Sequence, residues 1–230
     1  MLEHWAWCET GPETLMKKRV GILISGRGSN MMSLVAAAKP ANYPAQIVVV
    51  ISNRPDAAGL AWAKAQGLPT IAIDHKAYAS RTEFEEVMHE ALIAHGAEMV
   101  ACCGFLRLMT PDFVEVWRDR MINIHPALLP SYKGLHTHER ALADGVRIVG
   151  CTVHVVRAEM DVGPIIGQAA VGVIEGDTPG TLAQRVLAAE HVLYPQALAL
   201  FASGKARIDG EKIIVDGANQ PVEPLFSPGI

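Results

Sequence analysis

Hydrophobic positions follow two alternating patterns from residue 19 onward. Short, almost continuous apolar runs of strand length are separated by stretches in which apolar residues recur at helical spacing. The apolar runs are RVGILIS (19–25), QIVVVIS (46–52), PTIAID (69–74), AEMVACCGF (97–105) and MINIH (121–125). The predicted helices cover 30–39, 56–67, 80–96 and 110–117. Alternation of helices with strands that are apolar on both faces indicates a covered parallel sheet, so we expect a doubly wound, Rossmann-like α/β fold.

The pattern changes after residue 125. PALLPSYKGLHTH (126–138) is punctuated by proline and glycine and predicts a loop, followed by a helix over 139–145. Two adjacent strands are then predicted over 147–156 and 163–173, with RAEMDV as the loop between them. A long helix over about 178–203 and a β-hairpin over 205–217 complete the pattern. We therefore expect an antiparallel extension at the C-terminal side of the parallel sheet.

The two ends of the chain lack this periodicity. Residues 1–18 hold two of the four tryptophans and a Gly-Pro break, and residues 218–230 are rich in proline. We expect 1–18 to be an N-terminal extension that is irregular in structure, 19–217 to be the functional domain, and 218–230 to be an irregular tail.

Composition and charge narrow the classes of partner. Half of the 230 residues are hydrophobic, the net charge is −4, and no basic stripe is visible, so neither nucleic acid nor an anionic membrane surface is favoured. The apolar runs are shorter than the roughly 18–20 residues that span a bilayer. The N-terminus lacks the pattern of a secretory signal. Because the cysteines also lack metal-type spacing, we expect buried, reduced thiols in a cytoplasmic protein: Cys8, Cys102, Cys103 and Cys151.

The glycine-rich stretch SGRGSN (25–30) lies between the first predicted strand and the first helix. Such a loop can turn tightly and present backbone N–H groups to an anion, although an ordinary βα turn would look similar. The dinucleotide fingerprint G-x-G-x-x-G fails because Met31 occupies the third glycine position. The second strand ends without an acidic residue for a ribose hydroxyl, and Arg54 is weak support for NADP. A single phosphate group fits this loop better than NAD.

Asn123 and His125 stand two residues apart at the end of a predicted strand. Side chains alternate along a strand, so both lie on one face, at the carboxyl edge where open α/β sheets bind ligands. An amide N–H and an imidazole could stabilise an oxyanion and transfer a proton there. A polar pair that only anchors the following loop is the alternative.

Further candidates for this site lie downstream. Asp161 precedes Gly163-Pro164, and a carboxylate near an imidazole would favour its protonated form and fix its tautomer; a simple turn is the alternative for Asp161. His154 in TVHVV could be a strand-buried partner for a loop carboxylate. His136 and His138 mimic a metal pair, but residues two apart do not face each other on a helix, so we expect no metal.

Taken together, these stretches resemble the phosphoribosylglycinamide formyltransferase family of purine biosynthesis. The matching segments, in the family's order and spacing, are LISGRGSN, GFLRLM, NIHPALLPSYKGLHTHERAL, TVHVVRAEMDVGPII and AEHVLYP. The resemblance covers about residues 19–215. The N-x-H-P-[SA]-L-L-P segment with D-x-G-P downstream marks the wider formyltransferase superfamily, and S-G-x-G-S-N points to the branch that uses glycinamide ribonucleotide.

The resemblance implies roles for individual residues. The implied catalytic residues are Asn123, His125 and Asp161. Those implied to bind the substrate's phosphate are Gly28, Ser29 and Asn30, with Glu190 at its ribose. The implied pocket for 10-formyltetrahydrofolate consists of Arg81, Leu106, Arg107, Leu108, Met109, Asn123, Arg157, Ala158, Glu159, Met160 and Asp161. The reaction would transfer a formyl group from this co-substrate, through a tetrahedral intermediate and without a metal.

Other functions remain open at this point. A formyltetrahydrofolate hydrolase could use the same three catalytic residues with water as acceptor, but that family carries a further domain before the first strand, for which 18 residues leave no room, and lacks S-G-x-G-S-N. A methionyl-tRNA formyltransferase would need a C-terminal RNA-binding domain. An NADP-dependent oxidoreductase and a non-catalytic phosphate sensor are conceivable on fold alone. The sequence does not decide between a monomer and a homodimer.

Overall fold

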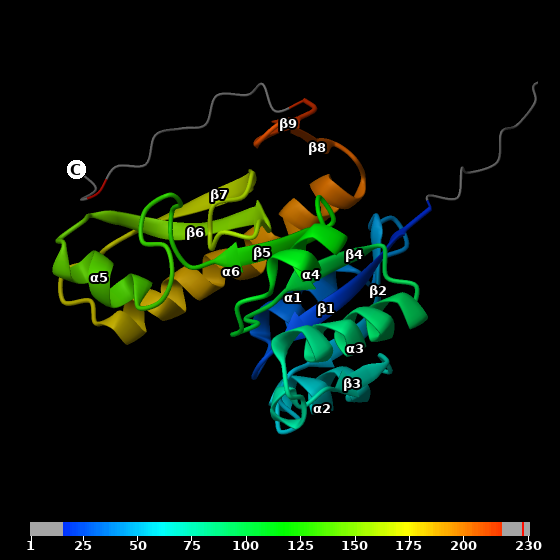
Figure 1. The fold of residues 1–230 in the computed structure, drawn as a ribbon. Helices are drawn as coiled ribbons and strands as arrows, with labels where there is room; N and C mark the ends of the chain where they lie inside the picture. The colour runs from blue at the N-terminus through cyan, green and yellow to red at the C-terminus, as the bar shows by residue number, and fades with distance from the viewer. Residues whose placement is uncertain (1–15, 218–226, 228–230) are drawn as a thin grey trace, which may run out of the picture.

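The computed structural model describes residues 16–217 and Ser227, which form a seven-stranded sheet with flanking helices (Figure 1). The strands of this sheet are β1 (Lys18–Ile24), β2 (Ala45–Ser52), β3 (Thr70–Ala72), β4 (Met99–Cys102), β5 (Met121–His125), β6 (Ile148–Val155) and β7 (Ile165–Gly172). A separate two-stranded sheet consists of β8 (Ala206–Asp209) and β9 (Lys212–Val215). The helices are α1 (Ser29–Ala37), α2 (Ala58–Ala65), α3 (Arg81–Ala94), α4 (Pro111–Val116), α5 (Thr137–Ala143) and α6 (Pro179–Ala202), with a 3-10 turn, η1 (His75–Ala77).

The strand order is β3-β2-β1-β4-β5-β6-β7. The first five strands are parallel to one another, and β6 and β7 are added in antiparallel pairs. The chain builds outward from β1 to β3 and then returns to place β4 on the other side of β1. This reversal creates a switch point between β1 and β4, where open α/β sheets bind ligands. The fold predicted from the sequence is confirmed.

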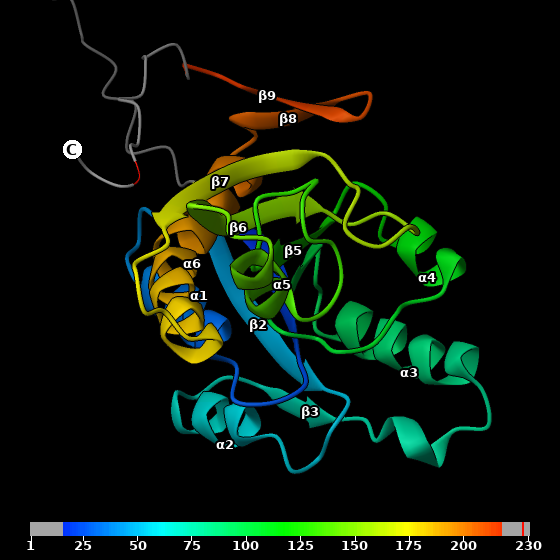
Figure 2. The same ribbon diagram turned by 90° about the vertical axis from the view of Figure 1, so that its left-hand side faces the viewer.

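Helices cover both faces of the sheet (Figure 2). In β1, Ile22 and Ile24 pack towards α1 and α6, whereas Leu23 packs towards α3 and α4. This alternation fills two apolar cores, one on each side of the sheet, and explains why the strand reads as a continuous apolar run. A third, smaller core joins α5, β6 and α6. The sheet is therefore held firmly under the loops that follow its strands.

Some boundaries differ from those predicted. The apolar run 97–105 contributes only β4, because the chain turns away at Gly104, where φ is 74°. The run 69–74 ends early and is followed by η1, which Asp74 caps by accepting from the backbone N–H of Lys76. The helix predicted over 139–145 begins two residues earlier, at Thr137. The predicted extension and tail, 1–18 and 218–230, lie largely outside the described residues, so these two boundaries stay predictions.

Candidate functional site

The carboxyl ends of β1 and β4 place two loops side by side at the switch point. The loop after β1 contains the glycine-rich stretch 25–30, and the loop after β4 contains Leu106–Met109. The backbone N–H of Ser25 donates to the carbonyl of Gly104 (3.2 Å), so the two loops are in direct contact. The segments implied to bind the two substrates thus meet at one edge of the sheet.

Register in the antiparallel pair β5–β6 brings further polar residues to this edge. Asn123 lies opposite His154, and His125 lies opposite Thr152. Directly opposite residues share one face, so an amide, two imidazoles and a hydroxyl form a single polar group of side chains. His125, Thr152 and His154 are buried.

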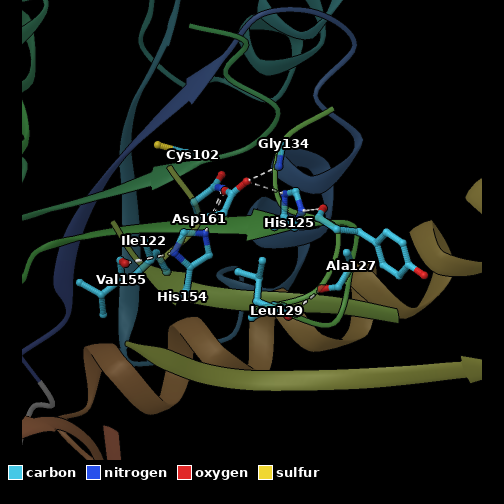
Figure 3. Close-up of polar contacts among 12 residues, drawn as sticks. Cys102, Ile122, His125, Ala127, Leu129, Gly134, His154, Val155 and Asp161 are labelled. Atoms are coloured by element: carbon cyan, nitrogen blue, oxygen red, sulfur yellow. Dashed lines mark hydrogen bonds and ion pairs between the residues drawn. The ribbon is translucent and has the colours of Figure 1, made fainter. Parts of the chain in front are cut away.

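Asp161 lies between the two histidines (Figure 3). One carboxylate oxygen is 3.4 Å from Nδ1 of His125, and the other is 3.7 Å from Nε2 of His154. The backbone N–H of Gly134 donates to the same carboxylate (2.9 Å). The structure therefore brings together the three residues expected to be catalytic, although they come from β5 and from the loop after β6.

The protonation of His154 follows from its neighbours. Its Nδ1 lies 3.1 Å from the carbonyl of Val155, which can only accept, so Nδ1 carries a proton. Burial lowers the pKa of His154 below its ordinary value, so the ring is neutral and Nε2 has a free lone pair. The amide nitrogen of Asn123, 3.3 Å away, donates to that lone pair. His154 therefore orients the amide of Asn123 and leaves its second N–H for a ligand.

His125 has acceptors on both sides. Nε2 lies 2.9 Å from the carbonyl of Tyr132, and Nδ1 faces Asp161. Each of these acceptors can take a hydrogen bond from a ring N–H. Tyr132 belongs to the loop between β5 and α5, and it adopts a left-handed backbone with φ of 54°. This loop therefore lies against the Nε2 edge of His125.

The glycine-rich loop leads into a helix N-terminus. Gly28 caps α1 with φ of 68°, a conformation that side chains disfavour, and no side chain caps the helix. The first backbone N–H groups of α1 are those able to meet an anion. The side chain of Asn30 is buried and donates to Glu190 on α6 (2.6 Å). Contact between Asn30 and a phosphate would thus use its backbone N–H.

Glu190 is itself buried, and burial raises the pKa of its carboxyl above the ordinary value. α1 and α6 lie side by side, so residues expected at the phosphate and at the ribose are in direct contact. The spacing of 160 residues between them gives no sequence signal for this contact.

The segment after β4 lies near the start of α3. Leu106 and Leu108 are exposed, and the guanidinium of Arg107 lies 5.6 Å from the ring centroid of Phe84 on α3. Met109 packs on the same core as Val156, the residue before Arg157. Arg81 begins α3 and is exposed. The segments 106–109 and 157–161, both expected to bind the folate, thus converge on one core.

The loop that carries Asp161 is fastened at its start. Arg157 forms ion pairs with Asp119 (2.9 Å) and with Glu211 in the β8–β9 turn (3.1 Å). Its charge is therefore already paired, and a role at a ligand falls to the backbone or to the following residues. Ala158, Glu159 and Met160 are exposed at the rim of the site, whereas the side chain of Asp161 is only 9% exposed.

Several polar residues that support the site were not predicted. Thr152 donates to the carbonyl of Ala127 (2.7 Å) and accepts from Leu129 (3.0 Å), which fixes the start of the loop after β5. Gln168 on β7 donates to the same threonine and to Leu129. Thr152 precedes His154 by two positions in an otherwise apolar strand, and this period-two pair of polar residues is the signal that could have found it.

Two further features of the described residues are the arrangement of potential metal ligands and the state of the cysteines. Within 16–217 and Ser227, no group of three or more His, Cys, Asp or Glu side chains is arranged to hold a metal ion. Cys102, Cys103 and Cys151 are buried free thiols, and burial raises the pKa of Cys102 to about 12. No helix of this part of the chain is long and apolar enough to cross a bilayer.

Comparison with known proteins gives a consistent result. A family model described as "Formyl transferase" matches residues 18–198. The phosphoribosylglycinamide formyltransferase of Escherichia coli (strain K12) is 38% identical over 201 residues, which are 87% of this chain and 94% of that protein. The crystal structure of glycinamide ribonucleotide transformylase 1 from Symbiobacterium toebii matches with a TM-score of 0.85 and 43% identity, covering 87% of this chain and 95% of that chain.

Two further matches differ in architecture or activity. The trifunctional purine biosynthetic protein adenosine-3 of Homo sapiens is 46% identical over 192 residues, 84% of this chain but 19% of that protein. The chain thus spans about a fifth of such multifunctional relatives. A formyltetrahydrofolate deformylase from Burkholderia mallei matches with a TM-score of 0.79 and 26% identity. The family model, the match to nearly the full length of the Escherichia coli enzyme and the shared fold all agree. The chain therefore belongs to the formyl transferase family, in its phosphoribosylglycinamide formyltransferase branch.

Proposed function

We propose that this protein transfers the formyl group of 10-formyltetrahydrofolate to the primary amine of glycinamide ribonucleotide, in the cytoplasm and without a metal. The observation that carries the proposal is the convergence of Asn123, His125 and Asp161 at the carboxyl edge of the sheet. A sensor that only binds a phosphate ligand would not need this group of donors beside a buried carboxylate.

The chemistry follows from the groups that meet there. The amine nitrogen attacks the formyl carbon, the carbonyl oxygen becomes an oxyanion, and the bond to N10 then breaks as a proton moves from the amine to N10. The free N–H of Asn123 would donate to the oxyanion, and removal of one such donor typically costs about 2.7–4 kcal/mol of barrier. Asp161 would orient the ring of His125 through Nδ1 and assist the proton transfer, directly or through water.

His125 would supply the second donor. Its Nε2 lies 2.9 Å from the carbonyl of Tyr132, a neutral acceptor. A formyl oxygen that gains negative charge is a stronger acceptor than a carbonyl, so the substrate would take the place of Tyr132 at Nε2. The proposal therefore requires the carbonyl of Tyr132, in the loop after β5, to move away from Nε2 so that the formyl oxygen can bind there.

The substrate pockets would flank these donors. The N-terminal N–H groups of α1 would bind the phosphate, through Gly28, Ser29 and Asn30, and Glu190 would accept from the ribose. The folate would lie against the exposed apolar side chains at the other side of the site, since a flat heterocycle buries such surface well. These side chains are Leu106, Leu108 and Met160, with Arg81, Arg107, Met109 and the loop 157–161 completing the pocket.

A formyl-transfer assay tests the proposal. The purified protein is mixed with 10-formyltetrahydrofolate, and tetrahydrofolate release is followed by absorbance with and without glycinamide ribonucleotide. Release that requires the ribonucleotide, together with formylated product by mass spectrometry, is the expected outcome. Release at the same rate without the ribonucleotide would instead favour hydrolysis, the activity named for the Burkholderia mallei neighbour.

A further inference from the structure

A buried hydroxyl joins the two loops of the switch point. The Oγ of Ser25 accepts from the backbone N–H of Leu106 (2.8 Å) and donates to Oδ1 of Asn53 (2.6 Å). Ser25 is the first residue of the glycine-rich loop, and Leu106 is the first of the Leu106–Met109 segment. They are 81 positions apart in the chain.

The surroundings make this contact a fixed one. Ser25 and Asn53 are both buried, so neither can exchange the bond for water without opening the sheet edge. Asn53 lies at the end of β2, and its carbonyl is 2.8 Å from Nδ1 of His75 in η1. The hydroxyl of Ser25 is thus oriented by one neighbour and presents a defined lone pair to Leu106.

We infer that Ser25 is a positioning residue that couples the binding of the two substrates. The inference rests on the proposed function. Because the contact between Ser25 and Leu106 is fixed, a phosphate that draws in the loop 25–30 would move Ser25 and Leu106 together. The shift would then reach the folate segment that follows Leu106. Coupling between sites is reciprocal, so a folate would tighten ribonucleotide binding by the same factor.

Calorimetry can measure this coupling without turnover. Tetrahydrofolate, which has no formyl group to transfer, is titrated into the protein with and without saturating glycinamide ribonucleotide. In the parent protein we expect the ribonucleotide to tighten tetrahydrofolate binding about fivefold or more. In Ser25→Ala we expect this factor to fall below about twofold, because Leu106 loses its acceptor while the backbone contact from Ser25 to Gly104 remains.

Three further variants separate this role from general damage. Ser25→Thr keeps the hydroxyl and should restore the factor. Ser33→Ala removes a hydroxyl that bonds only to Asn30 within α1 (2.8 Å) and should keep the parent factor. Glu85→Gln perturbs the C-terminal end of the segment Leu106–Met109, where Glu85 accepts from the backbone N–H of Thr110 (3.0 Å). This variant should weaken tetrahydrofolate binding by the same factor in the presence and in the absence of the ribonucleotide.

The outcomes distinguish the inference from the proposed function. A parent protein that binds both ligands and turns over, with the same coupling factor in Ser25→Ala, would overturn the inference alone. Equal loss of coupling in Glu85→Gln would also overturn it, since loosening of the loop would then be sufficient. A parent protein that binds neither ligand and transfers no formyl group would overturn the proposed function and this inference with it.

Discussion

Asp161 is the residue on which the polar contacts of the site converge, since its carboxylate faces both histidines and the N–H of Gly134. Asp161→Asn keeps the shape of the side chain and removes the negative charge that faces His125 and His154. We expect kcat to fall at least about tenfold in a protein that stays folded, measured by the formyl-transfer assay beside circular dichroism. Normal turnover in the folded variant would refute the assigned role.

Asn123→Ala tests the neutral donor in the same way. The side chain would no longer reach His154 or the formyl oxygen, and kcat should again fall about tenfold or more. Because the proposed defect concerns the transition state, the affinity for tetrahydrofolate should change much less than kcat. A loss confined to ligand binding would show instead that Asn123 only shapes the pocket.

Glu190→Gln separates the function of a residue from its effect on stability. Burial raises the pKa of Glu190, so the ionised side chain costs the folded state free energy that is absent below pH 4.5 and appears as pH rises through the raised pKa. At pH 7 the variant should therefore unfold at the same or higher urea concentration. Its KM for the ribonucleotide should rise about tenfold, because a charge-assisted hydrogen bond is lost. An unchanged KM would contradict the proposed ribose contact.

Sequence reasoning predicted the positions of Asn123 and His125 better than the contacts of the residues around them. Asn123 and His125 could be predicted because strand periodicity and the parallel sheet dictate their face and edge. The pairing of Asn30 with Glu190, and of Ser25 with Leu106, depends on contacts between distant segments that no local pattern encodes. The ion pairs of Arg157 are a similar case, because the sequence does not reveal that Asp119 and Glu211 lie beside it.

The loop after β6 is the element most tightly constrained by a single glycine. A Cβ at Gly163 would lie 1.6 Å from the carbonyl oxygen of Val155, so Gly163→Ala must displace the loop that carries Asp161. We expect kcat to fall about tenfold or more although no reacting group is changed. Gly180→Ala is the matched control, since its Cβ would meet only Oγ1 of Thr178 at 3.8 Å. Equal activity of the two variants would contradict this role.

Elements with strong capping signals were predicted well. Ser80 accepts from the N–H of Glu83, and the carboxylate of Glu83 accepts from the N–H of Ala79, so α3 begins where the predicted helix 80–96 does. Thr110 caps α4 ahead of Pro111 in the same manner. The early end of β4 and the 3-10 turn η1 could not be predicted, because neither follows from apolar periodicity. The turn at Gly104 ends β4, and the cap from Asp74 accompanies η1.

The whole molecule should lose stability in mild acid. Burial lowers the pKa of three histidines below 6.5: His138, His154 and His191. The unfolded chain therefore binds more protons below pH 6.5 than the folded chain, and stability that is fully present above pH 6.5 is lost as pH falls through the lowered values.

Urea denaturation at pH 7.5, 6.5 and 5.5 measures this effect. We expect the free energy of unfolding to fall over this range, and the fall to be smaller in His154→Gln, because glutamine does not titrate. His136→Gln, at an exposed side chain, is the control for the exchange of a histidine for glutamine. A parent protein with equal stability at all three pH values would contradict the prediction.

Because β1 lies between β2 and β4, the chain could be divided into two fragments that share the switch point. A cut in the connection between η1 and α3 would leave β1, β2 and β3 in one fragment and β4 to β9 in the other. Neither fragment would contain the whole switch point, because Ser25 would lie in the first fragment and Leu106 in the second. Two such fragments, each fused to one member of a binding pair, would form a split enzyme whose formyl transfer reports that the members have met.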